Sequence, residues 1–116
     1  MLLNLSNHPF ENWSDSQKQA AIDRFGSVQD LAFPNIDPEF TKDEITDLVR
    51  EYIIKAQSFH PNCIHIMGEL TFTFSFVSFC RYIGVKCFAS TTHRIVEEID
   101  GKKVTTFDFK QFRPYF

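Results

Sequence analysis

An α/β architecture is predicted by the segment Ile64-His65-Ile66-Met67-Gly68-Glu69-Leu70-Thr71, near the middle of the chain. The segment has the pattern of a buried strand that stops at a glycine, where a helix begins. In α/β folds such a junction directs the free backbone N–H groups of the first helical turn toward a ligand. We therefore expect polar groups from several strand ends to surround one crevice that holds a polar, phosphorylated ligand.

Upstream of this segment, two helices are marked by their capping residues. Ser14 with Gln17, and Thr41 with Glu44, have the spacing of a capping box. Gly26 suits the end of the first helix, and His60-Pro61 stops the second. Short apolar runs between the helices predict strands at 2–5, 28–33, 63–67 and 85–89.

The segment 70–83 is ambiguous, because Phe72, Phe74 and Phe76 alternate as in a strand. Phe72 and Phe76 also belong to a stripe with helical spacing that continues to Ile83. We predict a helix, since apolar strands flank the segment at the distance that a right-handed crossover needs. Gly84 suits the end of that helix.

After Arg94, two β-prone runs at 95–99 and 102–109 flank Asp100-Gly101, which predicts a hairpin. The predicted order is β-α-β-α-β-α-β followed by this hairpin. It describes a single domain, residues 1–116, with a Rossmann-like three-layer α/β sandwich, a mostly parallel sheet and a C-terminal β-hairpin.

The composition excludes several classes of protein. A formal charge of -3 argues against binding to long nucleic acid, which favours a basic face. The three cysteines form no C-x-x-C pair and suit reduced intracellular thiols. No apolar stretch has the length of a signal peptide or a membrane span, so we expect a cytoplasmic protein without a membrane partner. Fourteen Phe exceed the needs of one small core and suggest a homodimer contact.

Three polar segments follow the predicted strands, and each also has a purely structural interpretation. The segment 6–8 would be a turn, Gly68 would serve the strand-to-helix junction, and 90–94 would be a polar strand end. The hydroxyls of 90–92 and the permanently charged Arg94 suit phosphate oxygens and adenine edges. The candidate ligand-binding residues are Ser6, Asn7, Gly68, Glu69, Leu70, Thr71, Ser90 and Thr91.

His65 lies within an apolar strand, where a hydrogen-bonded core histidine is the more common role. His60, Cys63 and His65 have an H-x-x-C-x-H spacing that resembles a zinc motif, but only Cys63 and His65 share a strand face. No fourth ligand is nearby, so we expect neither a metal site nor a cofactor. The common dinucleotide, P-loop, hydrolase and metalloprotease motifs are also missing.

The layout resembles the small CRISPR-associated proteins of type III systems, the CARF-like stand-alone ring nucleases. The resemblance is carried by 3–9 (LNLSNHP), 64–69 (IHIMGE) and 89–94 (ASTTHR). It implies a homodimer in antiviral defence whose two strand-end rims form one site for a cyclic oligoadenylate second messenger. It implies degradation of this messenger by a phosphodiesterase activity. These small families share no single catalytic motif, so no catalytic residue is transferred from them.

The predicted mechanism is metal-independent cleavage, in which the 2′-hydroxyl of the ligand attacks the adjacent phosphate. The protein would hold the reacting atoms in line and stabilise the charge on the phosphate. The candidate catalytic residues are His8, Thr92, His93 and Arg94. Two alternatives remain, a non-catalytic module that binds or sequesters the ring and a structural or regulatory subunit.

Overall fold

A computed structural model describes all residues of the chain, 1–116. Five strands, three α-helices and a short 3-10 helix alternate along the sequence. In chain order they are β1 (Leu2–Ser6), η1 (Phe10–Asn12), α1 (Asp15–Phe25), β2 (Val28–Ala32), α2 (Lys42–Gln57), β3 (Cys63–Met67), α3 (Leu70–Ile83), β4 (Lys86–Ile99) and β5 (Lys102–Pro114).

The strands form one sheet in the order β2-β1-β3-β4-β5. The first four strands are parallel, and β5 pairs antiparallel with β4. The chain leaves β1 toward β2 on one side and later returns to β3 on the other. The gap between the carboxyl ends of β1 and β3 is therefore the switch point at which open α/β sheets bind ligands.

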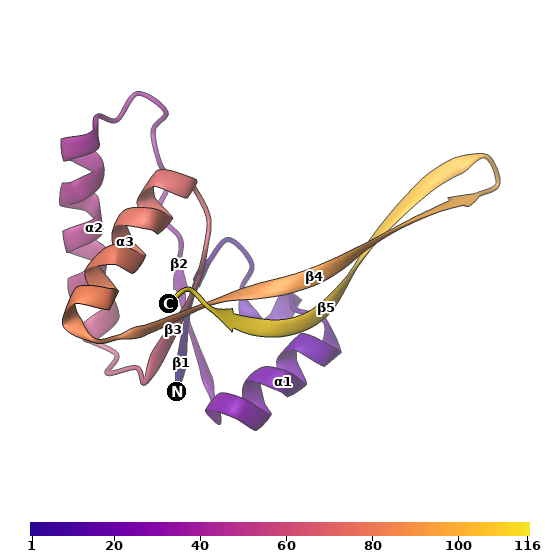
Figure 1. Cartoon of the computed structure of the whole chain (residues 1–116), viewed down its shortest axis with the longest axis horizontal. Helices are drawn as coiled ribbons and strands as arrows, with labels where there is room; N and C mark the ends of the chain where they lie inside the picture. Colours follow the sequence, from indigo (N-terminus) through magenta and orange to yellow (C-terminus); the bar gives the residue numbers. More distant parts are fainter.

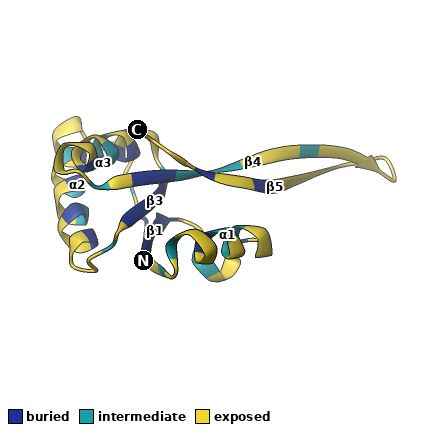
Figure 2. Cartoon of the chain, turned by 60° about the horizontal axis from the view of Figure 1, so that its bottom comes forward, coloured by how far each residue is buried: buried dark blue, intermediate teal, exposed yellow.

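Helices cover both faces of the sheet, which gives the predicted three-layer α/β sandwich (Figures 1 and 2). α2 and α3 lie on one face, and α1 lies on the other. The core is divided accordingly into two clusters of buried side chains. Leu3, Leu5 and Ile64 belong to the α2/α3 side, whereas Leu2 and Cys63 belong to the α1 side. This division follows from the alternation of side chains along each strand.

The ambiguous segment 70–83 is helical, as predicted. α3 buries Phe72 and Phe76 against the sheet, whereas the side chain of Phe74 is 75% exposed. Gly84 ends the helix in the left-handed conformation, with φ of 80°. The helical stripe therefore describes the segment better than the alternating pattern: a helix buries Phe72 and Phe76 together and turns Phe74 outward, whereas a strand would place all three on one face.

The prediction of a strand break after Ala89 is wrong. β4 continues without interruption from Lys86 to Ile99, and a bulge between Thr91 and Thr92 is the only irregularity in its pairing with β5. The run contains no Gly or Pro and is rich in β-branched residues, so nothing in it ends a strand. The distal parts of β4 and β5 form a two-stranded arm, residues 92–109, that projects from the body (Figure 1).

Candidate functional site

A row of polar residues crosses three neighbouring strands on the α1 face of the sheet. The strand register pairs Asn4 of β1 with Asp30 of β2 on one side and with His65 of β3 on the other. Asn4 and His65 are almost completely buried, with 1% and 2% exposure. Buried polar groups are costly unless they are hydrogen-bonded, so each of these groups needs a partner.

Asn4 supplies most of these partners. Its amide nitrogen donates to Asp30 Oδ1 at 2.9 Å and to the backbone carbonyl of His8 at 2.9 Å. Its amide oxygen lies 2.8 Å from Ser6 Oγ and 2.9 Å from His65 Nδ1. The Asn4 side chain therefore joins three strands to the turn that follows β1.

The imidazole of His65 continues the row toward β4, where its Nε2 atom lies 3.3 Å from Ser90 Oγ. Trp13 and Phe112 pack their rings edge-on to it, with centroids 5.2 Å and 5.6 Å away. Burial in these surroundings lowers the pKa of His65 from 6.5 to about 4, because the charged form would lose its hydration. The imidazole is consequently neutral at physiological pH.

A pocket of about 530 Å³ opens over this row, at the carboxyl ends of β1 and β3 and beside the middle of β4. It brings together six of the residues predicted from the sequence, namely Ser6, Asn7, His8, Gly68, Ser90 and Thr92. The rest of its lining consists of Asn12, Trp13, Ser14, Gln17, His65, Met67, Phe107 and Phe109. The expected meeting of three polar segments at one rim is therefore present.

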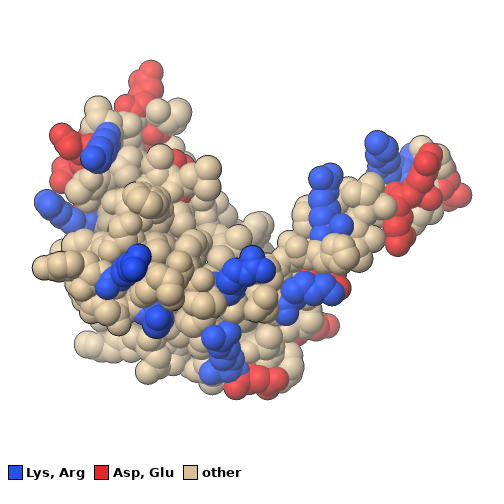
Figure 3. Space-filling view, in the orientation of Figure 1, with Lys and Arg blue, Asp and Glu red and all other residues tan.

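The lining of this pocket is polar and aromatic, but it includes neither Lys nor Arg. Arg94 lies further out, on the exposed arm, two residues beyond Thr92. On the face of the molecule in Figure 3, uncharged atoms separate the basic side chains, which form no continuous patch, and acidic side chains lie mainly toward the edges. The pocket therefore suits uncharged polar and aromatic parts of a ligand better than an isolated phosphate.

The predicted cluster 90–94 is divided between the two faces of β4. Ser90 and Thr92 line the pocket, whereas the hydroxyl of Thr91 bonds the backbone of Gln111, at 3.2 Å from its nitrogen and 3.3 Å from its oxygen. His93 is paired with Asp108 on the exposed arm. Because the segment is a continuous strand and not a loop, successive side chains point to opposite faces and cannot all reach one site.

The start of α3 is already occupied by a carboxylate from the chain itself. Glu69 accepts hydrogen bonds from the backbone nitrogens of Thr71 at 3.0 Å and Phe72 at 2.7 Å, and from the Thr71 hydroxyl at 2.6 Å. These bonds lower the pKa of Glu69, the hydroxyl contact having the largest effect. The two amides are therefore not free for a phosphate, and Leu70 beside them is 82% exposed.

Gly68 has a packing role in addition to its place in the pocket. A Cβ atom at this position would lie 2.3 Å from Cε2 and Cζ of Phe33, far inside van der Waals contact. The glycine thus lets the Phe33 ring pack beneath the strand-to-helix junction. The architectural interpretation of Gly68 is supported directly.

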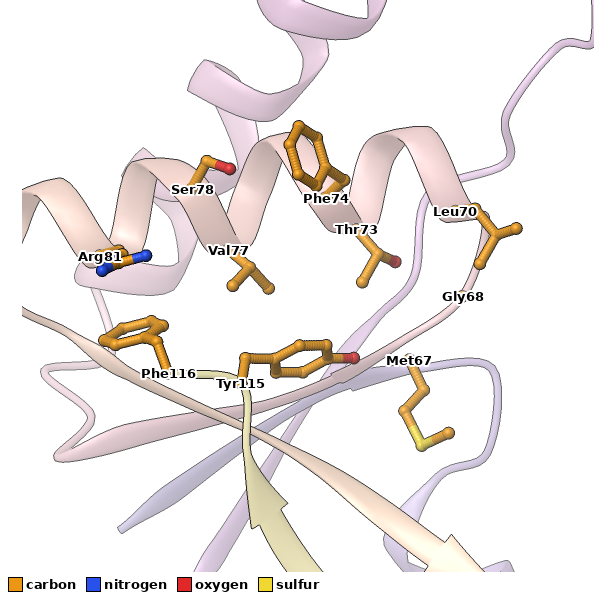
Figure 4. Close-up of a pocket in the computed structure, with 10 residues that line it drawn as sticks. All are labelled: Met67, Gly68, Leu70, Thr73, Phe74, Val77, Ser78, Arg81, Tyr115 and Phe116. Carbon is orange, nitrogen blue, oxygen red and sulfur yellow. The ribbon is translucent and has the colours of Figure 1, made fainter.

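A second cavity, of about 450 Å³, lies on the opposite side of the sheet between α3 and the C-terminal tail (Figure 4). The Tyr115 hydroxyl, which lies on one wall, donates to the carbonyl of Ile66 at 2.6 Å. The Phe116 ring lies beneath Arg81, with 5.9 Å between the guanidinium carbon and the ring centroid. Thr73 contributes a buried hydroxyl without a protein partner. The aromatic tail therefore packs on its own chain.

Sequence reasoning missed the central part of the site. The expectation of a hydrogen-bonded core histidine is confirmed for His65, but its place in the pocket lining and the central role of Asn4 are not apparent from the sequence. The available signal was the alternation of β1 and β3, which places each of these polar residues at a position whose strand neighbours on the same face are Leu2 and Cys63. Their pairing across the sheet depends on strand register, which the sequence does not specify.

Comparisons with known proteins add a family but no activity. No curated protein matches the chain, and no solved structure matches it. None of the helices combines the length and the apolar character needed to cross a membrane. No three His, Cys, Asp or Glu side chains are grouped so that they could hold a metal ion. A family model covers residues 1–113, nearly the whole sequence. The chain belongs to the family described as "Uncharacterized protein MJ1673 family".

Proposed function

We propose that this protein is a ring nuclease that binds and cleaves a cyclic oligoadenylate of type III CRISPR systems. The observation that carries the proposal is the pocket at the switch point of the sheet, where polar side chains from the ends of β1 and β3 and from the middle of β4 meet aromatic walls. Hydroxyl and amide groups suit ribose and base edges. Trp13, Phe107 and Phe109 supply surfaces for a nucleobase.

The proposed ring would be shared between two copies of the chain. The arm supports this proposal, because a two-stranded ribbon is at best marginally stable in water without further packing. On one face it exposes Phe107 by 65% and Val96 by 52%, and Phe107 also lines the pocket. A second copy packed on the arm would cover these side chains and lie close to the ligand. Two-fold symmetry would present the same groups to opposite phosphates of the ring.

The proposed reaction uses the ligand's own nucleophile. The 2′-oxygen loses its proton and forms a bond to the adjacent phosphorus, the bond from phosphorus to the 5′-oxygen breaks, and that oxygen takes up a proton. The products are a 2′,3′-cyclic phosphate and a 5′-hydroxyl. His8 and Thr92 line the rim where these proton transfers would occur, and Arg94 on the arm supplies the nearest charge on this face of β4.

A second candidate function, binding of the ring without cleavage, is favoured by the charge of the site. The pocket lining contains no cation, and Glu69 occupies amides at the start of α3 that would otherwise attract a phosphate. The negative charge on the phosphate in the transition state would then receive little stabilisation from one protomer alone. Sequestration of the messenger requires only the base and ribose contacts.

Turnover separates these two functions. The protein would be incubated with cyclic tetra-adenylate and cyclic hexa-adenylate, with and without EDTA, and the products separated by chromatography. Linear products with a 2′,3′-cyclic phosphate in both conditions support the nuclease. Intact rings that co-elute with the protein support the binding module, and rings that neither bind nor break overturn both.

The dimer is tested separately by sedimentation equilibrium of the full chain. We expect a mass of two chains for the wild type and of one chain for a Val96→Glu, Phe107→Glu double variant. A Thr106→Glu variant, on the opposite face of the arm, adds charge away from the proposed contact and serves as the control. A wild-type monomer at high concentration, with and without ring, would contradict a shared site.

A further inference from the structure

In the buried polar row, Asp30 at one end determines which atom donates and which accepts in each of the following hydrogen bonds. Asp30 is a carboxylate, which only accepts, and Asn4 approaches it with one atom of its side-chain amide. That same atom lies 2.9 Å from the carbonyl oxygen of His8, a second acceptor. It must therefore be the nitrogen, and the other atom of the Asn4 amide must be the oxygen.

The orientation of Asn4 in turn selects the tautomer of His65. The Asn4 oxygen has no hydrogen, so the His65 Nδ1 atom at 2.9 Å must carry one. Because the imidazole is neutral, its Nε2 atom then has a free lone pair. This acceptor points at Ser90 Oγ, 3.3 Å away.

The hydroxyl of Ser90 is consequently limited to one role toward the pocket. Both of its protein neighbours are acceptors, His65 Nε2 at 3.3 Å and the Met67 sulfur at 3.0 Å. Its single hydrogen is used inside the protein whichever of the two it contacts. Ser90 Oγ lines the pocket and has only lone pairs left for a ligand.

We propose that Ser90 is a specificity-determining residue whose oxygen accepts a hydrogen bond from an exocyclic amino group and rejects a carbonyl at the same place. This inference rests on the proposed function and deepens it, because it identifies which base edge the pocket reads. Adenine presents an amino group at its 6-position, whereas guanine and hypoxanthine present a carbonyl oxygen. A carbonyl facing Ser90 Oγ would bring two acceptors together without a hydrogen between them.

The size of the expected preference follows from the loss of one such contact. Two buried acceptors that face each other without a hydrogen should discriminate against the wrong base by about 10-fold to 100-fold. The aromatic residues of the pocket contribute affinity without distinguishing these bases, since every purine has an aromatic face on which they can stack. The preference should therefore depend on Ser90, whereas the overall affinity should depend mainly on the aromatic residues.

The test compares cyclic tetra-adenylate with cyclic tetra-inosinate, which has a carbonyl in place of each amino group. Titration calorimetry on the wild type should show tighter binding of the adenylate ring by about 10-fold to 100-fold. Ser90→Ala should reduce this ratio to near one. Thr91→Ala, which removes a hydroxyl from the opposite face of the same strand, should leave it unchanged. A ratio of two affinities is insensitive to a partial loss of folded protein.

The outcomes distinguish the two proposals. Equal binding of both rings by the wild type, or an undiminished preference in Ser90→Ala, overturns the role of Ser90 and leaves the proposed function standing. If neither ring binds, the proposed function is wrong and the inference fails with it.

Nitrogen-15 NMR of the free protein gives a test without ligand, in which we expect the hydrogen of His65 on Nδ1. A hydrogen on Nε2 would overturn the inference directly.

Discussion

Asn4 Oδ1 lies 2.9 Å from His65 Nδ1, although the two residues are 61 positions apart in the sequence. Each is almost fully buried, and the contact joins the neighbouring parallel strands β1 and β3 on the α1 face of the sheet. The same amide is bonded to Asp30 and to the carbonyl of His8. One asparagine therefore connects β2, β1 and β3 to the turn that forms the rim of the pocket.

Removal of the Asn4 side chain should destabilise the protein considerably. Asn4→Ala leaves the Nδ1–H group of His65 without its partner in a buried site, and it removes one bond to the turn after β1 and one to Asp30 of β2. We expect the free energy of unfolding to fall by about 2–3 kcal/mol, measured by urea denaturation. Asn7→Ala, at an exposed position of the same rim, should change it by less than about 0.5 kcal/mol.

The stability should also depend on pH through His65. Its pKa is about 4 in the folded protein and 6.5 when unfolded, so the unfolded chain binds a proton in this interval and the folded protein does not. His65 therefore leaves the free energy of unfolding unaffected above pH 6.5. As the pH falls from 6.5 toward 4, it lowers the free energy of unfolding by about 3 kcal/mol in total. Urea midpoints between pH 4 and 8 would measure it. In His65→Gln the free energy of unfolding should change less with pH in this interval. An equally steep pH dependence in that variant would contradict the assignment of the effect to His65.

A methyl group at position 68 should be poorly tolerated. Gly68→Ala places a Cβ atom 2.3 Å from two ring carbons of Phe33, so the ring or the strand end must move. We expect a loss of about 1–3 kcal/mol in thermal or urea unfolding. Phe33→Leu should make the same substitution less harmful, so the double variant should lose less than the sum of the two single changes. Additive losses would show that the glycine is needed for another reason.

Glu69→Ala should affect stability and anion binding in opposite directions. The variant removes the cap that accepts from the backbone nitrogens of Thr71 and Phe72, at a cost of about 1 kcal/mol in the free energy of unfolding. It also frees those amides at the positive end of the helix. We expect weaker stability together with tighter binding of inorganic phosphate, followed by NMR shifts of these two amides. Unchanged phosphate affinity would exclude the start of α3 as an anion site even without Glu69.

The three cysteines should be unreactive in the folded protein. Cys63, Cys80 and Cys87 are all free and buried. Burial raises the pKa of Cys63, and the contact with the Cys80 thiol raises that of Cys87, so little thiolate is present at pH 8. Ellman's reagent should label no thiol rapidly in native buffer and three in 6 M guanidinium. Rapid native labelling of one thiol would indicate local opening of the sheet or of α3.

Much of the fold was predictable from local sequence. The capping residues before α1 and α2, and the glycines that end α1 and α3, act within a few positions of the elements that they delimit. The strand-to-helix junction at Gly68 and the alternation of apolar residues in β1 and β3 are equally local. These features were sufficient for the three-layer sandwich, because a helix between two buried strands has few alternative placements.

The site was predictable only in part. That Ser6, Asn7, His8 and Ser90 share a rim followed from the parallel strands. The sequence misled at 90–94, where five polar residues resembled a loop although their backbone belongs to a strand, so Thr91 and His93 face away from Thr92. It also leaves the position of the Glu69 carboxylate open among several arrangements, of which the structure shows the one that bonds the start of the helix.

By itself, the sequence determined which segments are helices and strands and that polar groups gather at the carboxyl edge of the sheet, because propensity, capping and side-chain alternation act over a few residues. Only the tertiary structure decided that Asp30, Asn4, His65 and Ser90 form one connected row. The physical reason is register: shifting a strand by one residue would turn these side chains to the opposite face. The local pattern of a single strand does not specify which residue of a distant strand lies beside it.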